Sequence, residues 1–332
     1  MNLPDIWASL ERDAQTGYVT RRVPHEHRPF DLRLAVISPG RARALLMRLH
    51  GEPPALGDLK ESTGFSLDAV TLPDELPDTY TLELRLSSAA YSDVFDALLT
   101  DVVARVVSSS TEAEAAAALL DQIQRWQRFL SRSAPEGLSR SQQVGLYGEL
   151  RALIHVIAPA VGTADAIAAW TGPSGTSQDF QLHGSALEVK TTTAKQPQHV
   201  RITSERQLDS TGIEALYLSH FSLDDRAGSG ETLPDLVASV RDLASDSNAT
   251  DALEERLFNS GYIDQHAHRY DEIGYTPRRS RVFRVTTDFP RIVEKHLGAG
   301  VGDVHYSIEL SACEPFESDL PVLQADLRER AR

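Results

Sequence analysis

Cysteine is almost absent from this 332-residue chain, and long apolar runs are absent altogether. Cys313 is its only cysteine, which excludes an intrachain disulfide and a cysteine-rich metal site and suits a reducing compartment. No run approaches the roughly 18 to 20 apolar residues that span a bilayer, and the first residues lack the basic and apolar pattern of a secretion signal. We therefore expect a cytoplasmic protein with no membrane association.

Positive charge is also scarce. The chain has 33 lysines and arginines against 48 aspartates and glutamates, which gives a net charge of -15. Because nucleic acid repels such a protein at long range, any nucleic-acid binding has to come from a local basic surface. The chain also lacks the GxxxxGK[ST] phosphate loop, so any dependence on ATP would have to come from a partner.

Lysine is the rarer of the two strong bases. The four lysines are Lys60, Lys190, Lys195 and Lys295. Lys190 is the last residue of a strand-like segment, "LEVK". Lysine offers a compact ammonium with an adjustable pKa, which arginine cannot supply, so its use there indicates either a chemical role or a chance survivor of an arginine-rich composition.

Hydrophobic periodicity and turn residues divide the chain into four regions. We predict a β-rich N-terminal module over 1–110, with a short helix at 41–50, and a helical bridge over 111–136. A central region over 137–225 and a C-terminal α/β extension over 226–332 follow. Within the central region we predict a helix over about 138–156, a strand at 215–223, and a helix that begins near 203, with Ser204 and Gln207 spaced as a capping box.

The segment "DFQLHGSALEVKTT", residues 179–192, alternates apolar and polar side chains like two half-buried strands. The apolar side comprises Phe180, Leu182, Leu187 and Val189. The polar side comprises Asp179, Gln181, Glu188 and Lys190. A tight turn centred on Gly184-Ser185 would pair Leu182 with Leu187, Gln181 with Glu188 and Asp179 with Lys190. A slip by one residue would bury the carboxylates, yet a solvated hairpin with a cross-strand ion pair would show the same pattern.

Glu149 lies on the apolar face of the helix predicted over 138–156. It follows Leu146 by three residues and precedes Leu153 by four, so it shares their side of the helix. A carboxylate that faces inward needs a cation, a proton or hydrogen bonds, because an unpaired buried charge is very costly. An arginine or a metal ion could supply the positive charge.

The order of these parts resembles the PD-(D/E)XK nuclease superfamily. More narrowly, "GLYGEL", "QDF", "LEVKTT" and "QL" look like a bacterial group of PD-(D/E)XK motif proteins often found near phage-defence genes. The specific resemblance covers about 138–221. Gln178 stands where the motif has proline, a position that varies in the family. The resemblance implies an α/β (α+β) fold with a central mixed sheet flanked by helices, a restriction-endonuclease-like core.

The resemblance also implies a role for each motif residue. Asp179 and Glu188 would bind a divalent cation, Lys190 would be the motif lysine, Glu149 the acidic residue of the preceding helix, and Gln207 the polar residue of the following helix. Phosphodiester hydrolysis requires an activated water and neutralisation of phosphoryl charge. Mg²⁺, with Mn²⁺ as a substitute, supplies both when a few oxygens hold it. The Val189 carbonyl is the expected third ligand, and Glu149 could help to hold a second ion.

The sequence therefore predicts an Mg²⁺-dependent endonuclease that acts on DNA in a bacterial restriction or phage-defence system, with RNA left open as a substrate. Cutting both strands would most simply use a homodimer. A rival hypothesis is a catalytically silent scaffold whose acidic surface docks a partner such as an ATPase. A third is a chance match of the hairpin, which predicts no cation site.

Overall fold

The computed structural model describes residues 2–14, 17–24, 30–72, 76–131 and 134–330. The chain forms two compact units, Met1–Pro135 and Glu136–Arg332. The first unit therefore includes the helical segment predicted as a bridge, and the second includes the segment predicted as an extension. Each unit is described by itself.

The first unit is an antiparallel sheet with helices. Its helices are α1 (Leu3–Asp13), α2 (Ser92–Val106) and α3 (Glu112–Leu130), and its strands are β1 (Tyr18–Arg22), β2 (Asp31–Ile37), β3 (Ala42–His50), β4 (Phe65–Val70) and β5 (Thr79–Leu86). The strand order is β1-β2-β3-β5-β4. The helix predicted over 41–50 is wrong, because this segment is strand β3.

The second unit has more elements. Its helices are α4 (Arg140–Ala152), α5 (Ala158–Val161), α6 (Thr163–Ala169), α7 (Leu233–Leu243), α8 (Ser247–Asn259) and α9 (Leu320–Arg330), with a π-helical turn (Leu153–Ile157) between α4 and α5. Its strands are β6 (Phe180–Leu182), β7 (Ser185–Thr192), β8 (His199–Ile202), β9 (Ala215–Ala227), β10 (Ile273–Arg284), β11 (Tyr306–Glu309) and β12 (Glu317–Ser318).

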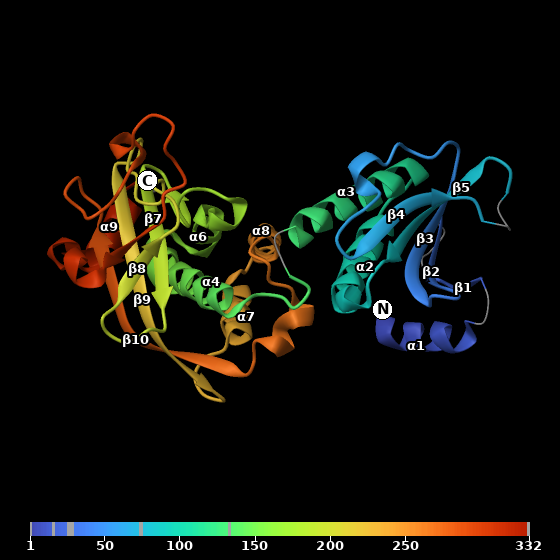
Figure 1. Ribbon diagram of the computed structural model, residues 1–332, viewed down its shortest axis with the longest axis horizontal. Coiled ribbons are helices and arrows are strands. Elements are labelled where there is room, and N and C mark those ends of the chain that lie inside the picture. Colours follow the sequence, from blue (N-terminus) through green and yellow to red (C-terminus); the bar gives the residue numbers. More distant parts are fainter. Residues whose placement is uncertain (1, 15–16, 25–29, 73–75, 132–133, 331–332) are drawn as a thin grey trace. The chain divides into compact units, whose positions relative to one another are not determined.

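The main sheet of this unit has the order β12-β10-β9-β7-β6. Strands β7 and β9 are parallel, whereas β6 pairs with β7, and β10 with β9 and β12, in antiparallel fashion. Figure 1 shows these strands with α4 against them. The predicted mixed sheet flanked by helices is thus confirmed, and β10 and β12 from the C-terminal part of the chain complete it.

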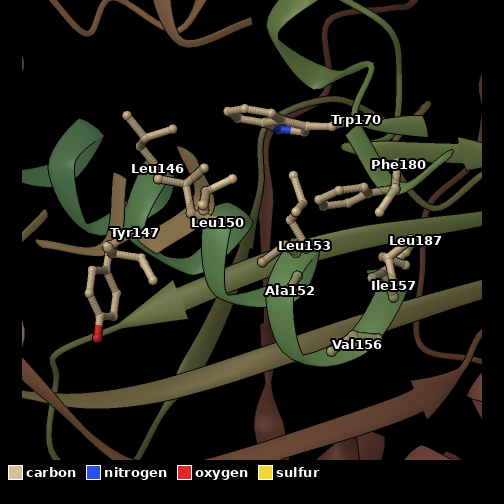
Figure 2. Close-up of a cluster of buried hydrophobic side chains, with 14 of the residues drawn as sticks. Leu146, Tyr147, Leu150, Ala152, Leu153, Val156, Ile157, Trp170, Phe180 and Leu187 are labelled. Atoms are coloured by element: carbon tan, nitrogen blue, oxygen red, sulfur yellow. The ribbon is translucent and has the colours of Figure 1, made fainter. Parts of the chain in front are cut away.

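Two clusters of buried apolar side chains cover the two faces of the main sheet. On the side of α4, the cluster includes Leu150, Leu153, Trp170, Phe180 and Leu187, all of which are fully buried; Figure 2 shows their side chains gathered between helix and strands. On the opposite side, Ala186, Leu218 and Phe283 pack against the two-stranded sheet of β8 and β11. Burial on both faces explains why consecutive residues are buried in these strands, 185–189 in β7 and 215–223 in β9.

One helical stretch among the described residues, Arg140–Val161, is long and apolar enough to cross a membrane by length and composition. Half of its apolar window is buried inside the unit. Its apolar side chains belong to the cluster that covers the sheet. A core helix of this kind accounts for the hydropathy of the stretch.

Candidate active site

The hairpin of β6 and β7 is present, but its register differs from the prediction. Phe180 pairs with Leu187 and Leu182 with Ser185, so the turn is His183-Gly184 rather than Gly184-Ser185. Gly184 has a φ of 70°, a value that glycine adopts without strain. The observed pairing is displaced by two residues, which leaves each side chain on its predicted face. Alternation therefore could not distinguish the two registers, because only an odd slip exchanges the faces.

A close contact between α4 and β7 brings Glu149 toward the hairpin. Gly148 is buried, and a Cβ atom added to it would lie only 1.7 Å from Oγ1 of Thr191. The helix backbone can therefore approach strand β7 only because residue 148 has no side chain. The next residue in the helix is Glu149, so this contact fixes the position of its carboxylate beside the strand.

Trp170 holds the Glu149 carboxylate. Its indole Nε1 donates a hydrogen bond of 2.8 Å to Oε2 of Glu149, and the ring is fully buried. This hydrogen bond was not predicted from the sequence. A buried indole N–H usually finds an acceptor, which is the signal that could have linked the two residues.

Asp179 lies directly before β6, where the two strands separate. Its Oδ2 accepts a hydrogen bond of 2.7 Å from the backbone N–H of Val189. Its neighbour Gly172 is also tightly placed, since a Cβ there would come within 3.0 Å of Oδ1 and 3.1 Å of Cα of Asp179. The aspartate is thus fixed across from the residue whose carbonyl is the predicted backbone ligand.

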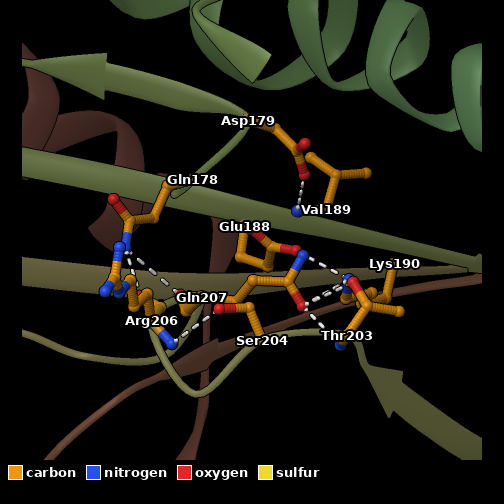
Figure 3. A network of polar contacts seen from close by, with 9 residues as sticks. All are labelled: Gln178, Asp179, Glu188, Val189, Lys190, Thr203, Ser204, Arg206 and Gln207. Atoms are coloured by element: carbon orange, nitrogen blue, oxygen red, sulfur yellow. Dashed lines mark hydrogen bonds and ion pairs between the residues drawn. The ribbon is translucent and has the colours of Figure 1, made fainter. Parts of the chain in front are cut away.

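Glu188 and Lys190 share one face of β7, the side away from Leu187 and Val189. Oε1 of Glu188 lies 2.7 Å from Nζ of Lys190, and Oε2 has no hydrogen-bond partner among the described residues. The Glu188 side chain is 1% exposed and that of Lys190 is 18% exposed. Lys190 therefore pairs with Glu188, not with Asp179 across the hairpin. Nζ of Lys190 also donates to Oε1 of Gln207, at 3.2 Å (Figure 3).

The segment that carries Gln207 is a turn and not the predicted helix. After β8 ends at Ile202, residues 205–208 form hydrogen-bonded turns. Ser204 does not cap a helix, although its Oγ accepts a hydrogen bond of 3.2 Å from the Arg206 N–H. The predicted Gln207 nevertheless reaches Lys190, so the structure brings all of the predicted side chains, from α4, β6, β7 and this turn, into one neighbourhood.

Negative charge is in excess at this place. Desolvation and the nearby Asp179 raise the pKa of Glu149 from 4.5 to about 8. Desolvation also raises the pKa of Asp179 and, together with Asp179, raises that of Glu188 well above its ordinary value. Burial alone would lower the pKa of Lys190, but Glu188 and the other carboxylates outweigh it and raise that pKa. Three carboxylates against one ammonium leave two negative charges uncompensated when all are ionised.

A divalent cation fits this deficit of positive charge. The unpartnered Oε2 of Glu188 and the desolvated Asp179 are oxygen donors of the kind that hard cations prefer. Within the described part of the chain, no three His, Cys, Asp or Glu side chains gather tightly enough to form a metal site by themselves. A cation here would rely on one or two carboxylates, a backbone oxygen and water, which is how Mg²⁺ is commonly held.

The comparison with family models agrees with this geometry. Residues 3–311 match the DUF4420 family, described as "Putative PD-(D/E)XK family member". This protein belongs to that family. The match extends over both units and so beyond the residues that carried the sequence resemblance. Searches of curated proteins and of solved structures find no match.

Replacing Glu149 by glutamine should flatten the pH dependence of stability in the metal-free protein. The raised pKa means that, between about pH 4.5 and about pH 8, the folded state holds more protons at Glu149 than the unfolded state does. Stability is therefore present below this window and falls as pH rises through it. Glutamine does not titrate, so the melting temperature of Glu149→Gln in EDTA should fall less from pH 5 to pH 8.

Thermal melts at several pH values test this expectation. Glu255→Gln, an exposed change on α8, is the matched control and should follow the wild type. Asp179 and Glu188 continue to titrate in the variant, so the slope should decrease without vanishing. Parallel curves for wild type and Glu149→Gln would show that Glu149 is not held in a desolvated, anionic environment.

Proposed function

We propose that this protein is a divalent-metal-dependent endonuclease that hydrolyses phosphodiester bonds in DNA, with Mg²⁺ as the cation and Mn²⁺ as a substitute. The observation that carries the proposal is the excess of two negative charges among Glu149, Asp179, Glu188 and Lys190, with a buried carboxylate oxygen that lacks a partner. Membership of a PD-(D/E)XK family supports the reaction class.

The chain's own residues divide the work in this proposal. A bound divalent cation supplies Lewis-acid polarisation of the phosphate and lowers the pKa of a water molecule. Asp179 and Glu188 hold the cation, with the Val189 carbonyl. Lys190 has a raised pKa, so it stays charged at neutral pH and acts by donating hydrogen bonds to the water or to phosphoryl oxygens, not by removing a proton. Glu149 holds a second ion or a water.

The proposed setting is a bacterial restriction or phage-defence system in the cytoplasm. Because the net charge of -15 repels DNA at long range, a local basic surface of the protein would have to bind the DNA. A homodimer would allow both strands to be cut, and light scattering with and without duplex tests that arrangement. RNA is the other substrate to be tried.

Cleavage assays test the proposal directly. Supercoiled and linear DNA, and single-stranded RNA, are incubated with purified protein in Mg²⁺, Mn²⁺ or EDTA. We expect metal-dependent cutting that Asp179→Ala abolishes, together with heat on addition of Mn²⁺ that the same variant loses. The exposed Asp165→Ala, on α6, is the control and should behave as wild type.

The competing role is a non-catalytic scaffold that binds a partner such as an ATPase. The acidic net charge favours it. Mn²⁺ binding without cleavage would indicate a nuclease that needs its partner. The absence of both Mn²⁺ binding and cleavage would overturn the enzyme proposal in favour of the scaffold.

A further inference from the structure

Two departures from the pattern of the wider PD-(D/E)XK superfamily lie next to each other in this structure. Gln178 replaces the motif proline, and the segment that carries Gln207 is a turn where the resemblance implies a helix. Figure 3 shows the Gln178 side chain, next to Asp179 and just before β6, extending to that turn. The two departures are therefore parts of one network of hydrogen bonds.

Gln178 is anchored at both ends of its amide group. Its Nε2 donates to the backbone carbonyl of Arg206 at 2.9 Å and, more weakly, to that of Gln207 at 3.4 Å. Its Oε1 accepts from Nε2 of Gln181 at 3.1 Å. Only the NH₂ group can serve two carbonyl acceptors, so the orientation of the amide follows from its partners. The side chain is 3% exposed, which makes these bonds obligatory in the folded state.

The turn has two backbone hydrogen bonds of its own, from the Gln207 N–H to the Ser204 carbonyl at 3.1 Å and from the Asp209 N–H to the Arg206 carbonyl at 3.2 Å. In a helix, backbone N–H groups four residues ahead would bond the carbonyls of residues 206 and 207. Here the chain leaves the turn at Asp209, and the Gln178 amide adds a donor to both carbonyls, which ties the turn to the segment that precedes β6. The other side of the turn is fixed by Leu208. Its side chain is fully buried, and its carbonyl accepts a hydrogen bond from Arg291.

The same turn presents Gln207 to Lys190. Oε1 of Gln207 accepts from the Thr203 backbone N–H at 2.8 Å and from Nζ of Lys190 at 3.2 Å. The Lys190 ammonium is thereby held between Glu188 on its own strand and Gln207 on the turn. A displacement of the turn would remove the second of these contacts and leave the first.

We propose that Gln178 is a positioning residue for Lys190, acting through the turn of residues 205–208 and Gln207. The expected effect of Gln178 on catalysis rests on the proposed function. Its expected effect on the position of the Lys190 ammonium rests only on the hydrogen bonds described above. The two parts can be tested separately.

The scarcity of lysine provides a direct readout of geometry. Protein grown with [ε-¹³C]lysine has four labelled side chains, and Lys190→Arg assigns the signal of interest. We compare Gln178→Met and Gln207→Met, which keep side-chain length but lose the hydrogen bonds, and the double variant. Each should move the Lys190 signal in the same direction at fixed pH, and the double variant should move it no further than Gln207→Met.

Gln181→Met is the matched control. It removes the hydrogen bond to Oε1 of Gln178 and leaves both hydrogen bonds that Nε2 of Gln178 donates to the turn. The Lys190 signal should therefore stay near its wild-type position. A merely structural role for Gln178 would lower the melting temperature without this selective change. If Gln178→Met does not fold, Gln178→Asn serves instead, because its amide stays polar but is one methylene shorter and loses its reach to the carbonyls.

Kinetics provide the second readout. We expect Gln178→Met to lower kcat by about 10- to 100-fold, with KM little changed, because small misplacements of a reacting group have effects of this size. The double variant should lose no more than Gln207→Met alone, as residues that act in series do. A wild type that neither cleaves nucleic acid nor binds Mn²⁺ would defeat the proposed function, and the lysine signal would still decide the present proposal. A Lys190 signal unmoved by Gln178→Met would overturn it.

Discussion

Lys190→Met should reduce DNA cleavage by about 100- to 1,000-fold, since removal of one well-placed donor to a charged transition state typically has an effect of this size. The variant keeps the length of the aliphatic chain but cannot donate to water or to phosphoryl oxygens. Mn²⁺ binding should persist or tighten, because the Lys190 ammonium repels a cation held by the carboxylates it contacts. Cleavage rates and calorimetry on the same sample measure the two effects.

Lys195→Met is the control for this prediction. Lys195 lies five residues further along the chain and is exposed, so its replacement changes the net charge equally without touching the site. It should retain cleavage within a few fold. If Lys190→Met cleaves like Lys195→Met, Lys190 takes no part in catalysis and the proposed mechanism is wrong.

Gly148→Ala should strongly destabilise the second unit. The new Cβ would meet Oγ1 of Thr191 at 1.7 Å and its Cβ at 2.9 Å, so rotation of the threonine relieves only part of the clash. Overpacking typically costs about 1–3 kcal/mol, against a gain of about 1 kcal/mol in helix propensity from the loss of glycine. Because the nearest contact is far inside van der Waals range, we expect a net loss of about 2 kcal/mol.

Thermal or urea unfolding measures this loss. Gly145→Ala, one turn earlier in the same helix, has no atom within 4 Å of the added Cβ and should gain roughly 0.5–1 kcal/mol through helix propensity. Thr191→Ala should partly restore the stability of Gly148→Ala. Equal stabilities for the two glycine variants would contradict the close approach of α4 and β7 on which the position of Glu149 depends.

Sequence patterns predicted the structure correctly where the question was which face of a strand or helix a side chain occupies. The alternation in residues 179–192 identified both strands and both faces, and the spacing of Glu149 from Leu146 and Leu153 placed it on the inward side of α4. Each of these inferences depends on a period set by backbone geometry. The register of the hairpin lies beyond that period, because a shift of two residues leaves every face unchanged.

Tertiary contacts decided the elements that the sequence predicted wrongly. The segment at β3 is rich in leucine, alanine, arginine and methionine, which favour helices in isolation. In the fold it is an inner strand, paired with both β2 and β5, and burial on both faces removes the alternation that would have indicated a strand. The capping-box spacing at Ser204 failed for a related reason, since Gln207 is drawn toward Lys190 and Thr203 instead of toward a helix N-terminus.

The distribution of the four lysines also determines how the folded protein meets a lysine-specific protease. Lys60, Lys195 and Lys295 are exposed, whereas Lys190 lies in strand β7, where it pairs with His220 of β9. Cutting at Lys190 therefore requires β7 to separate from its neighbours, while Lys195 lies in the loop just beyond that strand. The ratio of the two cleavage rates reports the free energy of local opening at the candidate active site, independently of global unfolding.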